Sequence, residues 1–131
     1  MKIYVDAMGG DLAPEAPVKG SLDALRKYPE LEIILAGRLE EIQRTLLEQA
    51  RAFRDARTTE VHNMDELGRA VENGFARAMW CGDRACEDEI KDKFNASSRN
   101  MPFDQEAFRF GDTCVCCGKK ADRVMYFAKA Y

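Results

Sequence analysis

Two pairs of cysteines have the spacing of a metal site. Cys81 and Cys86 are separated by four residues, Cys114 and Cys117 by two, and 27 residues lie between the pairs. Each close pair can occupy a turn that directs two thiolates to one point, and the long segment brings the second turn across. The spacing therefore predicts tetrahedral zinc bound by Cys81, Cys86, Cys114 and Cys117. Four cysteines leave no coordination position open, so this zinc would be structural and not catalytic.

Disulfides and reduced free thiols are the alternatives for these cysteines. Residues 2–6 lack the apolar region of a signal peptide. A fifth cysteine, Cys116, makes the number odd, which fits a secreted disulfide framework poorly. No segment approaches the roughly 18 apolar residues of a membrane span. We therefore expect a cytoplasmic protein without a membrane partner, in which metal binding is favoured and Cys116 is a spare thiol.

The composition is that of a globular chain without a dominant charge. Of its 131 residues 46% are hydrophobic and 33% charged, and 20 basic against 23 acidic residues give a net charge of -3. This balance gives no electrostatic argument for nucleic acid or membrane binding. Scattered cations of the C-terminal half are interpreted as a solvated surface, with weak tRNA contact as the less favoured alternative. These cations are Lys91, Lys93, Arg99, Lys119, Lys120 and Arg123.

The first 38 residues predict a βαβ unit. Residues 2–6 are rich in β-branched and aromatic side chains, as in a strand, and a helix is expected around residues 14–27. Residues 32–36 form the compact apolar run of a buried parallel strand. Together these elements indicate an α/β fold. A lone two-stranded sheet has open edges, so we expect a homo-oligomer.

The remaining residues predict helices followed by a small α+β domain. Residues 39–73 are expected to form a helical segment and residues 74–131 a four-cysteine zinc-binding domain. The expected helices cover 39–56, 64–72 and 84–94, and the expected strands cover 75–80 and 123–129 in a sheet of about three strands. Asn63 is the expected N-cap of the second of these helices.

No catalytic and no cofactor-binding residue is expected outside the cysteines. Gly9 and Gly10 lie between a strand and a helix, where backbone N–H groups can meet a phosphate. The flanking Asp6 and Asp11 would repel an anion, so a turn that needs glycine is the favoured interpretation. His62 is the single histidine, and a cap or loop role is favoured for it.

Residues 40–131 resemble a known family. The residues that carry the resemblance are 74–83, 87–91, 98–103, 114–119 and 126–131, with 53–55 and 62–67 upstream. They closely resemble the C-terminal zinc-binding domain of the archaeal/eukaryotic-like prolyl-tRNA synthetase, preceded by the end of its anticodon-binding domain. The resemblance implies a structural zinc and tRNA as a partner only in a full synthetase. It also implies a terminal carboxylate at Tyr131 that reaches toward an active site, although a plain chain end is equally well supported.

Residues 1–37 resemble a different and unrelated enzyme. The motif is Asp6-Ala7-Met8-Gly9-Gly10-Asp11, with the apolar run at 32–37. It is similar to the start of the phosphate acyltransferase of bacterial phospholipid synthesis, which makes acyl-phosphate from acyl-carrier protein and phosphate. The chain is thus interpreted as a chimera joined within 36–46, and an artificial fusion, a design and a misassembled gene are the alternatives for its origin.

These resemblances set the expected function. We expect a non-catalytic, zinc-binding C-terminal part of a prolyl-tRNA synthetase fused to a foreign α/β head, and no enzymatic activity in the isolated chain. The alternatives are a phosphate acyltransferase fragment and a fused scaffold without activity.

Overall fold

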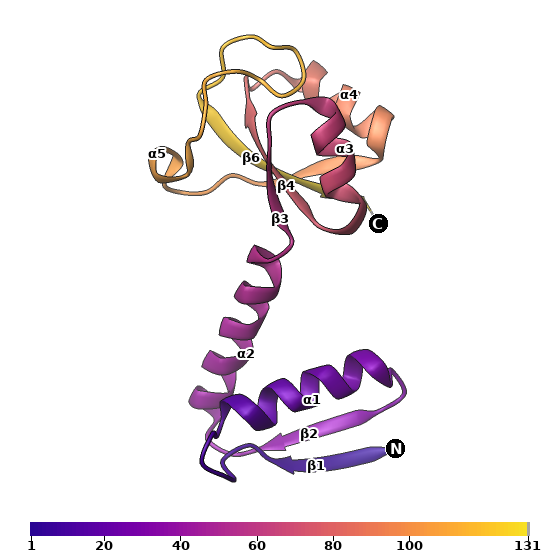
Figure 1. Cartoon of the computed structure of the whole chain (residues 1–131), viewed down its shortest axis with the longest axis vertical. Helices are drawn as coiled ribbons and strands as arrows, with labels where there is room; N and C mark the ends of the chain where they lie inside the picture. Colours follow the sequence, from indigo (N-terminus) through magenta and orange to yellow (C-terminus); the bar gives the residue numbers. More distant parts are fainter. Residues whose placement is uncertain (131) are drawn as a thin grey trace. The chain divides into compact units, whose positions relative to one another are not determined.

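Residues 1–130 are described by the computed structural model, in which the chain divides into two units (Figure 1). Unit 1 comprises Met1–Phe53, and unit 2 begins at Arg54. The expected role of the Tyr131 carboxylate lies outside the described residues. None of the described helices combines the length and the apolar character needed to cross a membrane.

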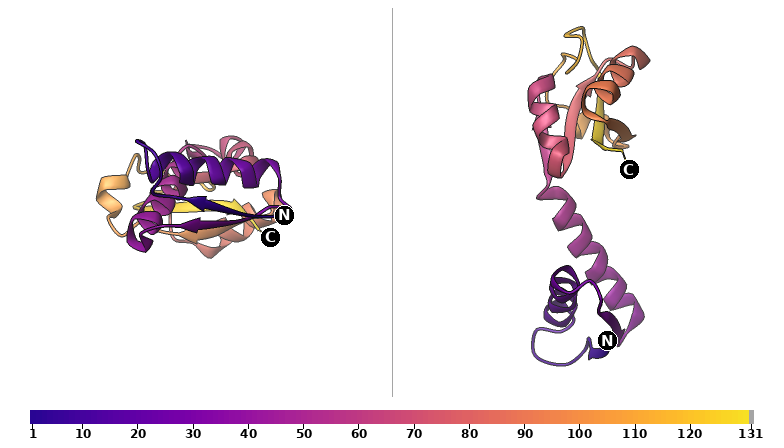
Figure 2. Two further views of the ribbon diagram at one scale, coloured as in Figure 1. Left: turned by 90° about the horizontal axis from the view of Figure 1, so that it is seen from below. Right: turned by 90° about the vertical axis from the view of Figure 1, so that its right-hand side faces the viewer.

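Unit 1 is built on a βαβ unit, as predicted. Its elements are β1 (Lys2–Asp6), α1 (Glu15–Lys27), β2 (Glu32–Ala36) and most of α2 (Leu39–Asp55). β1 and β2 are parallel, with Lys2 opposite Glu32 and Asp6 opposite Ala36. The left view of Figure 2 shows the two strands pointing the same way beside α1. The helices bury few side chains, chiefly Val18 of α1 and Ile42 of α2.

The turn between β1 and α1 is closed by Asp6. Its carboxylate accepts the backbone N–H of Met8 at 2.9 Å, and its carbonyl oxygen accepts that of Gly9 at 3.4 Å. Gly10 has a φ of 90°, in the left-handed region that favours glycine. These hydrogen bonds support the interpretation of this segment as a turn.

Unit 2 is a four-stranded mixed sheet with helices. Its strands follow the order β3-β4-β6-β5; β3 is parallel to β4, and β6 is antiparallel to both of its neighbours. The elements are β3 (Thr58–Val61), α3 (Met64–Asn73), β4 (Phe75–Trp80), α4 (Arg84–Phe94), β5 (Ala96–Asn100), α5 (Gln105–Phe108) and β6 (Arg123–Lys129). The fold class is therefore α/β, as predicted.

The core of unit 2 lies between the sheet and its helices. Phe127 of β6, Leu67 of α3 and Ile90 of α4 are fully buried in one hydrophobic cluster. Cys86 and Cys114 belong to the same cluster. The cysteine turns therefore extend the core of this unit.

The sheet of unit 2 has more strands than the sequence indicates. β3 was not expected, and β5 (Ala96–Asn100) forms in a region, residues 97–103, for which the sequence indicates an extended or irregular chain without naming a strand. In β3 only Val61 is buried and the sequence is Thr-Thr-Glu-Val, so this edge strand lacks an apolar alternation. β3 forms because it pairs with β4. The periodicity of its own sequence does not reveal this pairing.

Candidate metal centre

The first cysteine pair is positioned by the end of β4 and the start of α4. Cys81 directly follows Trp80, and Gly82 turns the chain with a φ of 86°. Asp83 is the N-cap of α4, and its carboxylate accepts a backbone N–H in the first turn. The indole N–H of Trp80 donates to the carbonyl oxygen of Asp83 at 3.2 Å. This turn carries Cys86 back toward Cys81.

The second pair occupies a short turn in the segment between α5 and β6. The backbone N–H of Cys114 donates to the carbonyl oxygen of Lys119 at 2.8 Å, and that of Gly118 donates to Cys114 at 3.1 Å. Gly118 has a φ of 69°, so glycine suits this position. The N–H of Val115 donates to the carbonyl oxygen of Met79 on β4 at 3.0 Å. This last bond fixes the second turn against the strand that ends in the first.

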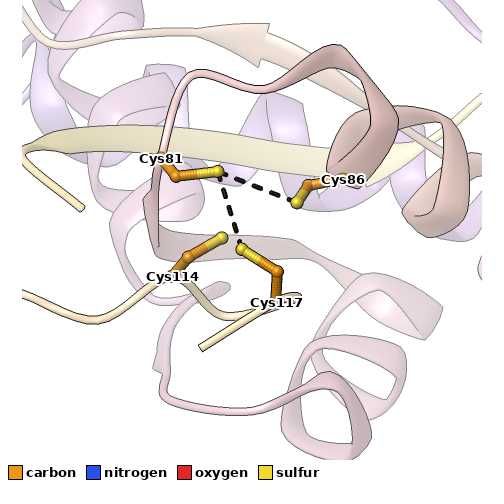
Figure 3. Close-up of side chains that lie close together, drawn as sticks. All are labelled: Cys81, Cys86, Cys114 and Cys117. Carbon is orange, nitrogen blue, oxygen red and sulfur yellow. Dashed lines mark hydrogen bonds between the residues drawn. The ribbon is translucent and has the colours of Figure 1, made fainter. Parts of the chain in front are cut away.

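The four predicted cysteines converge on one point (Figure 3). Their Sγ atoms all lie within 4.8 Å of one another. The Sγ of Cys81 lies 3.7 Å from that of Cys86 and 3.8 Å from that of Cys117. A tetrahedron with zinc–sulfur bonds of about 2.3 Å has sulfur–sulfur edges of about 3.8 Å. All four are free thiols and not disulfides, so the donor set fits a tetrahedral, thiophilic cation.

The four thiols differ in their surroundings. Cys86 and Cys114 are buried, Cys81 is half-buried and Cys117 is exposed. Burial raises the pKa values of the Cys81 and Cys86 thiols. At Cys117, hydrogen bonding from the backbone of Lys119 lowers the thiol pKa to about 7. The site thus has a buried interior side and one ligand at the surface.

Cys116 and His62 lie outside the cluster. The Cys116 thiol donates to the Glu89 carboxylate at 3.3 Å. The His62 ring contacts that of Phe110 edge to face, with centroids 5.4 Å apart. His62 also directly precedes Asn63, the N-cap of α3. These contacts support a spare thiol at Cys116 and a loop role for His62.

The scattered cations come from several elements of unit 2. Lys91 and Lys93 belong to α4, Arg99 to β5 and Arg123 to β6, while Lys119 and Lys120 lie in the second cysteine turn. The Arg99 guanidinium donates to the carbonyl oxygen of Lys129, and that of Arg123 lies 3.7 Å from the Asp122 carboxylate.

Sequence reasoning missed a pocket of about 610 Å³ in unit 2. Its lining includes Arg77, Glu60 and Phe108, and Arg77 pairs with Glu60 and lies over the rings of Phe108 and Phe110. The lining also includes Arg54, Asp55, Thr58, Phe75, Asn100, Pro102 and Tyr126. These residues come from four strands, the end of α2, α5 and a loop, so no local spacing marks them.

Two protein families match the chain. The family described as prolyl-tRNA synthetase, C-terminal, matches residues 64–131. The family described as fatty acid synthesis protein matches residues 1–93. The two matches overlap over residues 64–93. The match to the fatty acid synthesis protein family therefore extends beyond residues 1–37, which carry the N-terminal resemblance. Both expected resemblances are confirmed, and the chain is a chimera of the two.

Curated relatives are proline–tRNA ligases. That of Lachnoclostridium phytofermentans is 52% identical over 104 residues, which make up 78% of this chain and 21% of the relative. One from Clostridium botulinum is 49% identical over the same length and coverage, and ligase 2 of Bacillus cereus is 44% identical. The chain thus spans about a fifth of the length of these relatives.

Solved structures of two prolyl-tRNA synthetases share the fold. The enzyme of Giardia lamblia, in complex with prolyl-adenylate, has a TM-score of 0.57 at 29% identity. That of Cryptosporidium parvum, complexed with halofuginone and AMPPNP, has a TM-score of 0.62 at 28% identity. The matches cover 70% and 71% of this chain and 20% and 21% of those proteins. The chain belongs to the prolyl-tRNA synthetase C-terminal family through residues 64–131 and to the fatty acid synthesis protein family through residues 1–93.

Proposed function

We propose that unit 2 is a zinc-stabilised, non-catalytic C-terminal module of a prolyl-tRNA synthetase. Cys81, Cys86, Cys114 and Cys117 bind one structural zinc ion. The observation that carries the proposal is the convergence of these four thiols from two separate turns within the segment that matches the synthetase family.

The chemistry of the site favours a structural role. Four thiolates fill a tetrahedral zinc and leave no position for water or substrate. Without a cation the thiols of Cys81 and Cys86 stay protonated, because burial raises their pKa values; zinc would neutralise the four thiolates that bind it, and its binding would favour the folded state. The module acts with tRNA only as part of a longer synthetase, and the isolated chain carries no ligase activity.

The test is the zinc content of three matched variants. Cys81→Ser and Cys117→Ser each remove one ligand, while Cys116→Ser removes a thiol that donates to Glu89 and is not one of the four converging thiols. We expect one zinc per unaltered chain by elemental analysis and the same in Cys116→Ser after dialysis against a weak chelator. The two ligand variants should lose the metal.

Circular dichroism provides the control for these variants. The secondary structure of each variant is measured in zinc-free buffer and again after zinc is added. A variant that keeps its secondary structure but binds no zinc has lost the metal and not the fold. A folded unaltered chain without zinc, or equal zinc loss in all three variants, contradicts the proposed site.

A phosphate acyltransferase fragment is the second candidate, supported by the fatty acid synthesis match over residues 1–93. In the turn where phosphate would bind, the N–H groups of Met8 and Gly9 already donate to Asp6. We therefore expect no saturable binding of inorganic phosphate by calorimetry. Binding there, or formation of acyl-phosphate from acyl-carrier protein, would favour this candidate.

A further inference from the structure

The outer edge of β1 is open. Among the described strands β1 pairs only with β2. Ala7 donates its N–H to Ala36 at 2.8 Å, and Met1 accepts the N–H of Glu32 at 2.9 Å, so the odd-numbered residues of β1 direct their backbone groups to β2. In a strand, the alternate residues direct theirs to the opposite edge. The N–H and C=O groups of Lys2 and Tyr4 and the N–H of Asp6 therefore point outward, while the Asp6 carbonyl oxygen also accepts the N–H of Gly9 at 3.4 Å.

Unit 1 has a physical reason to gain another strand there. Parallel sheets are usually covered and flanked, and a sheet of two strands is marginally stable in water. Here the side chain of Tyr4, at the middle of the edge strand, is 70% exposed. The other described strands belong to the sheet of unit 2, so they do not extend this one.

The sequence of β1 is complementary to itself. It reads Lys-Ile-Tyr-Val-Asp, with opposite charges at its two ends. If two copies pair antiparallel about Tyr4, Lys2 faces Asp6 of the second copy, and Ile3 faces Val5 of the second copy. We propose that unit 1 forms a homodimer through this pairing, which joins two βαβ units into one sheet in the order β2-β1-β1-β2.

The backbone favours the same register. In an antiparallel pair, residues of a hydrogen-bonded pair exchange both N–H···O bonds, and such pairs recur at every second residue. Lys2, Tyr4 and Asp6 stand at these positions; Lys2 and Tyr4 have both backbone groups on the outer edge, and the Asp6 carbonyl oxygen is shared with the N–H of Gly9. Tyr4 of one chain then exchanges two backbone hydrogen bonds with Tyr4 of the second chain. The charge pairing and the hydrogen-bond pattern therefore select one alignment.

The outer edge of β2 lacks this complementarity. Its sequence is Glu-Ile-Ile-Leu-Ala, so an antiparallel copy would place Glu32 opposite Ala36 without any ion pair. Glu32 instead pairs with Lys2 of its own chain at 2.9 Å. Opposite charges across a strand pair stabilise it and like charges destabilise it, which makes β1 the preferred edge.

The dimer is expected to be reversible. The paired edge is only five residues long, whereas stable specific interfaces bury about 1,200–2,000 Å² in total. Sedimentation velocity of the full chain should therefore show monomers at low concentration and dimers at high concentration. Added salt should weaken the dimer because its ion pairs are exposed. A chain that stays monomeric at all accessible concentrations overturns the proposal.

Charge reversal tests the register. Lys2→Asp places two aspartates opposite each other at each end, and Asp6→Lys places two lysines there. Each variant alone should dimerise roughly tenfold more weakly or worse. Glu48→Lys is the matched control, because it reverses an exposed charge on α2, away from β1, and should leave the dimer unchanged.

Mixing the two variants separates pairing from damage within one chain. Lys2→Asp also disturbs the pair with Glu32, and Asp6→Lys removes the acceptor of the Met8 N–H. In a mixed dimer, however, each end brings one acid against one lysine. We expect the equimolar mixture to form a heterodimer at least as stable as the original dimer. Dimers that persist in both single variants, or a mixture that stays as weak as its components, overturn the proposed register.

The proposal is independent of the zinc site. The residues that carry it belong to unit 1, and the four cysteines belong to unit 2. The sedimentation measurements should therefore give the same result in the Cys81→Ser variant. Loss of the dimer in that variant would move the interface to unit 2 and overturn the pairing of β1.

Discussion

Gly74 joins α3 to β4 at a point where no side chain fits. A Cβ at this position would lie 2.1 Å from the carbonyl oxygen of Arg57. That oxygen accepts the N–H of Phe75 at 2.9 Å and holds the start of β4 beside β3. The φ of Gly74 is -170°, which is extended backbone. Glycine is therefore needed because of the close approach and not because of its backbone conformation.

Gly74→Ala should lower the free energy of unfolding of unit 2 by about 2 kcal/mol, because β4 must move away from the Arg57 carbonyl. Urea unfolding followed by the fluorescence of Trp80 measures this change. Gly20→Ala in α1 is the control: no neighbouring atom outside its own helix turn lies within 4 Å of its Cβ, and because it belongs to unit 1 the unfolding of unit 2 reported by Trp80 should stay unchanged. Equal stability of Gly74→Ala and the unaltered chain would contradict the clash.

At the residue scale, the sequence was most informative where function depends on local spacing. The four cysteines lie in two close pairs, so their grouping was predictable, and the fold brings them together. Arg77 and its pocket were not predictable, because Glu60, Phe108 and Phe110 meet it only through the strand order of the sheet.

Among the helices, α3 has a reciprocal cap at its start. The side chain of Asn63 accepts the backbone N–H of Glu66 at 2.9 Å, and the carboxylate of Glu66 accepts that of His62 at 2.8 Å. This arrangement satisfies two N–H groups at the helix start, as in a capping box. The hydrogen bond from the His62 backbone, with a smaller one from Asn63, lowers the pKa of Glu66.

The lowered pKa of Glu66 predicts a pH-dependent contribution to stability. Because the folded state favours the carboxylate, the contribution is complete above the ordinary pKa of about 4.3 and is lost as the pH falls through the lowered folded value. The difference in unfolding free energy between the unaltered chain and Glu66→Gln should therefore shrink in acid. Denaturant titrations from neutral to acidic pH measure it, and a difference that stays constant with pH would contradict the cap.

At the element scale, periodicity predicted the four longer helices and the apolar strands but missed β3 and the four-residue helix α5. α2 and α4 carry apolar residues at helical spacing, and their bounds differ from the expected ones by one residue at most. β3 is polar and short, and it exists because its parallel partner β4 is buried. Strands whose stability comes from a distant partner leave little trace in their own sequence.

For the whole molecule, the division into two units predicts a selective effect of metal removal. All four cysteines belong to unit 2, and binding that favours the folded state raises stability. A strong chelator should therefore lower the unfolding temperature of unit 2 and leave that of unit 1 in place. Hydrogen exchange with residue resolution, with and without chelator, measures the two separately. Equal loss of protection in α1 and in β6 would contradict this independence.

The position of β6 has a consequence for biosynthesis. β6 is an inner strand of its sheet and lies between β4 and β5. In the chain, however, it follows all the other strands of that sheet. During translation β3, β4 and β5 leave the ribosome first, and the buried strand β4 lacks its antiparallel partner until β6 emerges. Unit 1 has by then already left the ribosome, and domains fold in the order in which they emerge. A chain truncated before β6 should therefore contain unit 1 followed by an incompletely folded unit 2. Chaperones and proteases should recognise that incomplete unit.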